Sequence, residues 1–165
     1  FYHYFKTSEN FRRQLFDHHL NIANQMAIEI QVCKSLDPDY FTLVVKYKMF
    51  VLVQGQLTRR RNNSLYDTIC NEANEVTDKA LFPLWRNAFE LPDDPQLVFR
   101  HFSFFRNAFL SQANFDTLTH TLLHDILMEG NVMMKEVFRH QYSDIKKRTK
   151  SAEVPDRRSM AQSLN

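Results

Sequence analysis

Residues 8–36 read SENFRRQLFDHHLNIANQMAIEIQVCKSL, and this stretch decides the fold class. Apolar or semi-polar side chains recur in it every three or four positions, at Phe11, Leu15, His18 or His19, Ile22, Met26, Ile30 and Cys33. This spacing places them on one face of an α-helix. Because the stripe is unbroken, we expect one long amphipathic helix from Ser8 to Leu36.

A second helix is expected to follow at once. Asp37 is suited to an N-cap and Pro38 to the first helical position, and the apolar pattern then runs to about Leu57. The β-branched stretch 48–53 can pass for a buried strand, but no turn signal precedes it, so we interpret it as helix. Gly55 and the polar run 59–63 indicate an end or kink.

Three more helices complete the expected fold. The helical period restarts near Leu65, and Pro83 predicts a bend before the aromatic residues that follow it. Asp94 and Pro95 provide a cap and a first turn for a helix that runs to Gln112, and Asn114 can cap the last one. Its apolar positions are Phe115, Leu118, Leu122, Ile126, Met133, Val137 and Phe138. The polar, basic residues that come after predict a tail without packed structure.

Composition supports an all-α helical bundle of one domain. The 165 residues are 44% hydrophobic, enough for one sizeable core, and 2 glycines with 5 prolines are too few turn residues for an all-β chain. No apolar run reaches the length of about 20 residues that crosses a bilayer, and the start lacks the order of a signal peptide. We therefore expect a cytoplasmic protein without a membrane partner.

Charge and cysteine usage narrow the function classes. A formal net charge of +2 is not the strongly basic signature of a self-sufficient nucleic-acid binder, so any contact with DNA must be local. Cys33 and Cys70 both lie on apolar-periodic stretches and form no multi-cysteine framework, which disfavours zinc and disulfides. The first residue is not methionine, and we expect an N-terminal portion to be missing.

The opening residues FYHYFKTSENF resemble the segment of TetR-family regulators that links the DNA-recognition helix to the long helix after it. The family pattern is an apolar residue, Tyr, aromatic or His positions, Phe, a basic or small residue, and then a polar cap and Glu. The matching residues are Phe1, Tyr2, Tyr4, Phe5 and Glu9. Ser8 stands where the family commonly has Lys, and Phe11 where it commonly has Leu. The match covers about the first fifteen residues.

The resemblance implies a TetR-type ligand-binding and dimerisation domain. Residues 1–6 would be the remnant of the helix-turn-helix domain, residues 7–146 the sensing and dimerising domain, and residues 147–165 a polar basic tail. The function implied is that of a ligand-responsive regulator, a repressor by preference, that binds operator DNA as a homodimer and needs no cofactor. The last helix would supply the dimer interface, through Leu118, Leu122, Ile126, Gly130 and Met133.

Two residues of the opening segment are candidates for DNA contact. A Tyr hydroxyl and a Lys ammonium near a helix N-terminus suit phosphate oxygens, because both donors and the helix dipole favour an anion. Tyr2 and Lys6 are therefore the predicted phosphate contacts, and the base-reading residues would lie upstream of Phe1. The alternative is that Tyr2 and Phe5 only pack the junction between two domains.

Aromatic residues are the candidates for an effector pocket. The chain has 15 Phe, 6 Tyr, 6 Met and 1 Trp, which suits an apolar or aromatic small molecule. The predicted pocket residues are His19, Met26, Tyr47, Phe50, Trp85, Phe89, Phe102 and Phe105. Ordinary core packing explains the same residues, because an aromatic stripe at helical spacing is usually core.

Other patterns are weaker. His120 and His124 share a helix face and are half of a possible metal site, but two ligands do not make one, so we predict no metal. The three arginines 59–61 complement a helix dipole as readily as they contact DNA. No phosphate loop, activated nucleophile or carboxylate pair indicates an enzyme. The alternative function is a DNA-independent helical carrier of small ligands or a protein-interaction module.

Overall fold

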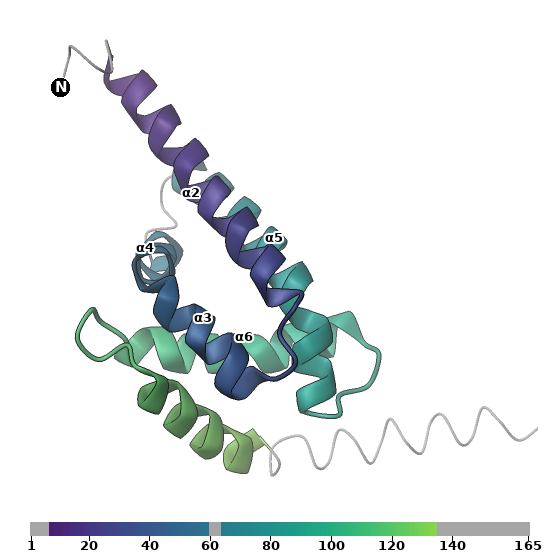
Figure 1. The fold of residues 1–165 in the computed structure, drawn as a ribbon. Coiled ribbons are helices and arrows are strands. Elements are labelled where there is room, and N and C mark those ends of the chain that lie inside the picture. Colours follow the sequence, from purple (N-terminus) through teal and green to yellow (C-terminus); the bar gives the residue numbers. More distant parts are fainter. Residues whose placement is uncertain (1–6, 60–63, 135–165) are drawn as a thin grey trace, which may run out of the picture. The chain divides into compact units, whose positions relative to one another are not determined.

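The computed structural model describes residues 7–59 and 64–134, and every regular element within them is helical, as the sequence predicts (Figure 1). Those elements are α2 (Ser8–Ile30), the π-helical turn η1 (Leu36–Tyr40), α3 (Phe41–Lys46), α4 (Lys48–Arg59), α5 (Ser64–Ala88) and α6 (Pro95–Gln112). A further helix covers residues 120–134. The chain divides into two compact units after Leu127, so the short described part of the second unit is treated by itself.

Helix α2 begins where the sequence predicts but ends six residues early. Thr7 is its N-cap, and the Thr7 Oγ1 accepts a hydrogen bond of 3.1 Å from the Asn10 amide. The helix ends at Ile30, so the predicted end at Leu36 is wrong. The physical reason lies downstream: the Asp39 carboxylate accepts hydrogen bonds from the amides of residues 34 and 35, at 2.8 and 3.1 Å, and holds them outside the helix.

The next helical stretch is capped by Ser35 and not by Asp37. The Ser35 side chain accepts from the Asp39 amide, whereas Asp37 has an extended conformation with φ −116° and ψ 120°. The stretch 48–53 is helical, as predicted. However, the predicted single helix is interrupted at Tyr47, where φ −93° and ψ 25° separate α3 from α4.

Two predicted breaks are absent because tertiary packing outweighs local propensity. Helix α5 continues through Pro83 to Ala88, and Leu81 and Trp85 on either side of the proline are 1% and 3% exposed. Burying both favours a continuous helix over the bend that proline alone predicts. Gly55 lies inside α4, and a Cβ there would come within 2.8 Å of the Leu110 Cδ2, so glycine makes room for the Leu110 side chain of α6.

The predicted start of α6 is confirmed, and the predicted start of the last helix is wrong. The Asp94 Oδ1 accepts hydrogen bonds from the amides of residues 96 and 97, at 2.9 and 3.2 Å, directly before Pro95. Asn114, by contrast, caps only a turn over residues 115–117. The helix begins later, where the Thr119 Oγ1 accepts from the Leu122 amide at 3.2 Å.

Helices α2 and α5 run side by side (Figure 1), and this is the most extensive contact between two labelled helices. The buried face of α2 is formed by His19, Ala23, Met26, Ala27 and Ile30. Helix α5 also packs against α4 and α6, and it therefore lies at the centre of the first unit. No helix in the described residues is both long and apolar enough to span a bilayer.

Candidate ligand-binding site

A cavity of about 110 Å³, open on one side, lies in the first unit and is lined by side chains of every helix from α2 to α6 and of residues 123–127. Most of its wall is aromatic or aliphatic. The polar side chains of the wall are those of Tyr40, Gln54, Asn74, Thr77, Asp78 and Arg106. The cavity therefore combines an apolar interior with one polar side, as small-molecule sites commonly do.

Five of the eight predicted pocket residues line this cavity: Met26, Phe50, Trp85, Phe102 and Phe105. They come from four helices, which the sequence pattern alone does not bring together. His19 is not part of the cavity wall. However, its Nε2 lies 2.8 Å from the Oε1 of Gln54, and Gln54 is part of the wall. The aromatic stripes of the sequence thus contribute both to packing and to the cavity surface.

Tyr47 and Phe89 lie outside the cavity wall. Tyr47 occupies the kink between α3 and α4, and its hydroxyl donates to the Glu29 Oε1 at 2.7 Å, which directs the ring toward α2. The same carboxylate receives the Lys46 ammonium at 2.5 Å. Phe89 packs behind the wall, with its ring centroid 4.8 Å from that of Trp85.

Trp85 is the centre of an aromatic cluster between α5 and α6. Its ring centroid lies 5.2 Å from that of Phe102 and 5.3 Å from that of Phe105, both at steep interplanar angles. Its indole Nε1 donates to the Nδ1 of His101 at 3.0 Å. Burial lowers the pKa of His101 to about 4, so the imidazole is neutral at physiological pH.

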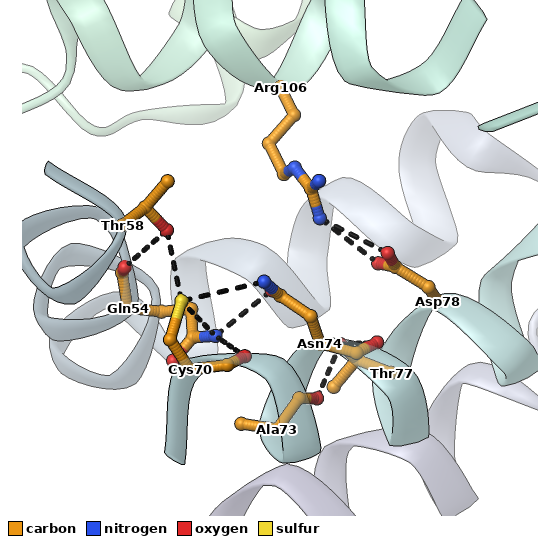
Figure 2. Close-up of polar contacts among 8 residues, drawn as sticks. All are labelled: Gln54, Thr58, Cys70, Ala73, Asn74, Thr77, Asp78 and Arg106. Atoms are coloured by element: carbon orange, nitrogen blue, oxygen red, sulfur yellow. Dashed lines mark hydrogen bonds and ion pairs between the residues drawn. The ribbon is translucent and has the colours of Figure 1, made fainter. Parts of the chain in front are cut away.

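An ion pair bridges α5 and α6 across the polar side of the cavity. The Arg106 Nη1 lies 3.1 and 3.3 Å from the two carboxylate oxygens of Asp78 (Figure 2). The two side chains are 19% and 12% exposed. Burial raises the pKa of Asp78 to about 6 although the neighbouring guanidinium acts in the opposite direction, so desolvation outweighs the ion pair.

A second polar group joins α4, α5 and α2. The Gln54 Nε2 donates to the Cys70 carbonyl at 2.8 Å and to the Asn74 Oδ1 at 2.9 Å (Figure 2). Its Oε1 faces the His19 Nε2, which must then carry the ring proton. Burial lowers the pKa of His19 and thereby favours this neutral form. One amide thus connects the cavity wall to α2.

Asp78, Arg106, Gln54 and Asn74 are not among the site residues that the sequence predicts. Each is a polar residue that normally lies on a solvated helix face. The available signal was their register: Asp78 lies three residues before Leu81 and seven before Trp85, and Arg106 lies four after Phe102 and three before Phe109. Both charges therefore occupy the apolar stripes of their helices.

The remaining predicted site residues differ in burial, and some of them lie outside the described residues. Tyr2 and Lys6 lie outside the described residues, as do Arg60, Arg61 and the tail. Leu118 is 0% and Ile126 7% exposed, so both belong to the core of the chain itself, and Leu122 is half-buried. In the second unit Gly130 is buried and Met133 is 60% exposed.

The predicted histidine pair converges on a carboxylate. His124 Nδ1 lies 2.7 Å from one Asp37 oxygen, and His120 Nε2 lies 3.0 Å from the other without hydrogen-bond geometry. No group of three or more His, Cys, Asp or Glu side chains in the described part of the chain is arranged to hold a metal ion.

Comparisons of the chain with protein-family models, with curated proteins and with solved structures gave no match.

Proposed function

We propose that the chain is the ligand-sensing and dimerising domain of a TetR-type transcription regulator, most simply a repressor, and that the cavity is its effector site. The observation that carries the proposal is the link between the cavity and α2. Met26 of α2 is part of the cavity wall, and His19 of α2 is hydrogen-bonded to Gln54, which is also part of it. A molecule in the cavity therefore contacts the helix that follows the FYHYF segment.

The mechanism that follows is a two-state one. A ligand that fills the cavity better in one arrangement of α2 and α4 increases the population of that arrangement. Because DNA-reading heads would be attached before Ser8, a shift of α2 changes their separation in a dimer. The heads then no longer match successive major grooves, and the operator is released. Tyr2 and Lys6 stay the proposed phosphate contacts.

The proposed dimer uses the last helix. In its described second-unit part, the exposed large apolar side chains are those of Met128, Val132 and Met133, at 54%, 67% and 60% exposed. Residues four apart share one helix face, so Met128 and Val132 form a stripe that a second copy would cover. Since Leu118 and Ile126 are buried in the chain itself, the interface is proposed to be centred on residues 128–133.

The test has two stages. Light scattering of the chain is expected to give the mass of a dimer. A longer form, carrying the natural sequence upstream of Phe1, is then expected to select a palindromic operator from a random DNA pool. A monomeric chain whose longer form selects no DNA would reject the regulator and favour the ligand carrier.

A further inference from the structure

The polar side of the cavity offers a ligand one charge pair and the Tyr40 side chain, whereas Gln54, Asn74 and Thr77 already make hydrogen bonds within the protein. Gln54 and Asn74 bond to each other, and the Thr77 hydroxyl donates to the Ala73 carbonyl at 3.0 Å. Arg106 and Asp78 remain as the charged groups of the cavity wall. A ligand that is recognised here by its charge must interact with one of these two.

The geometry of the ion pair favours Arg106 as the anchor. Both of its hydrogen bonds to Asp78 come from the single nitrogen Nη1, so the pair does not use the two-pronged geometry of which a guanidinium is capable. The guanidinium carbon also lies 5.0 Å from the ring centroid of Phe102, a cation–π contact that holds the charge at the aromatic wall. The guanidinium is thus positioned against the apolar interior.

Of the two groups in the pair, Asp78 loses its charge more readily. A guanidinium keeps its charge at every physiological pH, whereas burial disfavours the Asp78 carboxylate and raises its pKa to about 6. A carboxylate on a ligand can therefore replace Asp78 on Arg106 when Asp78 takes up a proton, which a pKa of about 6 makes accessible near neutral pH. The ligand would also bring an apolar body that the aromatic wall can cover.

We propose that the cavity binds a small monocarboxylic acid with an apolar body of about one aromatic ring, with its carboxylate on Arg106 and its ring against Trp85, Phe102 and Phe105. Because this cavity of about 110 Å³ is smaller than an engineered apolar cavity of about 150 Å³ that holds benzene, the apolar body can be no larger than one ring, and the rest of the ligand must lie in the open side of the cavity. The inference rests on the cavity being the effector site of the proposed function, and it names the class of effector.

The experiment compares 3-phenylpropanoate with 3-phenylpropan-1-ol, which has the same carbon skeleton and no charge. Calorimetric titration of the chain is expected to show binding of the acid about tenfold tighter than of the alcohol, because a charge-assisted pair replaces a neutral hydrogen bond. Arg106→Gln is expected to remove this preference while the alcohol still binds. Arg100→Gln, on the exposed face of α6, is the matched control and is expected to keep it.

Asp78→Asn is expected to bind the acid severalfold tighter, because it removes the competing carboxylate. If Arg106→Gln does not fold, as judged by circular dichroism, Arg106→Lys takes its place and is expected to lower the preference by losing the planar fork. Equal binding of acid and alcohol to the unaltered chain, or a preference for 3-phenylpropylamine, would overturn the acid assignment and leave the effector site standing. Binding of none of the three would overturn both.

Discussion

The Trp85 indole Nε1 donates a 3.0 Å hydrogen bond to the His101 Nδ1, and this bond joins α5 to α6 behind the cavity. An indole nitrogen can only donate, so Nδ1 must be unprotonated and the ring proton must lie on Nε2. His101 is 4% exposed. Protonating Nδ1 would therefore both break this bond and place a charge in the core.

The first prediction concerns His101 and acid stability. Its pKa is about 4 in the folded chain against an ordinary 6.5, so between these values the unfolded chain binds more protons. Stability must fall as pH falls through this window, by about 2 kcal/mol between pH 7.5 and pH 5. Measured by urea unfolding relative to the unaltered chain, His101→Phe is expected to be more stable at pH 5 than at pH 7.5 by this amount, whereas the exposed control His18→Gln is expected to show no such change.

The second prediction concerns Asp78, whose contribution to stability changes with pH in the opposite direction. Its pKa is raised from 3.8 to about 6, so the folded chain binds more protons between these values and the Asp78 contribution to stability rises as pH falls. Relative to the unaltered chain, Asp78→Asn is expected to be more stable at pH 7.5 than at pH 5, by about 1 kcal/mol. Exposed Asp125→Asn is the control. An unchanged difference at the two pH values would contradict the prediction.

The third prediction concerns the amide shared by three helices. Gln54→Leu leaves His19 and Asn74 without the partners they have at 2.8 and 2.9 Å. Stranding buried polar groups costs about 1–3 kcal/mol, so the free energy of unfolding is expected to fall by that amount. Gln56→Leu, two residues away on the exposed face of α4, is the matched control. Equal unfolding free energies for the two variants would show that the amide carries no stability.

The fourth prediction separates stability from binding at Gly55. Alanine favours a helix over glycine by about 1 kcal/mol, but its Cβ would displace the Leu110 Cδ2, which is a flexible side-chain end. The unfolding free energy of Gly55→Ala is expected to stay within about 1 kcal/mol of that of the unaltered chain. Because Leu110 also lines the cavity, affinity for 3-phenylpropan-1-ol is expected to fall. Adding Leu110→Ala should restore it, and failure to restore it would contradict the steric explanation.

The fifth prediction tests the proposed dimer face. Val132→Lys places a charge at a position that is 67% exposed in the isolated chain but would be buried by a second copy. The light-scattering mass is expected to change from dimer to monomer. Glu72→Lys, at an exposed position of α5 and outside residues 128–133, introduces the same residue and is expected to leave the dimer intact. A dimer that tolerates Val132→Lys would move the interface elsewhere.

Local signals predicted some elements well. Asp94 and Pro95 act within one turn of the chain, so their effect needs no knowledge of the fold, and α6 begins where they indicate. The start of α2 at Ser8 is another such case. Pro83 failed as a signal because the burial of Leu81 and Trp85 depends on contacts that are remote in sequence. Ser35 and Asp37 are both of residue types that commonly cap helices. Ser35 is the N-cap because Asp39 bonds to the amides of residues 34 and 35.

The site was predictable only in its apolar part. Met26, Phe50 and Trp85 were identified by type, since aromatic and sulfur-containing side chains line both cores and cavities. The ion pair of Asp78 and Arg106 was not identified, because the two residues are 28 positions apart and only the packing of α5 on α6 brings them together. A sequence gives the register of each residue on its own helix, but not which neighbouring helix that face meets.

The pairing of α2 with α5 also determines how the chain has to fold. Residues 31–63 separate the two helices, so their contact requires the closure of a long loop. The chain loses the conformational entropy of this loop before it gains the contact. Individual helices form within about a microsecond. We therefore expect the slow step to be the docking of two helices already formed, although the helical content of the described residues alone would suggest fast, local folding.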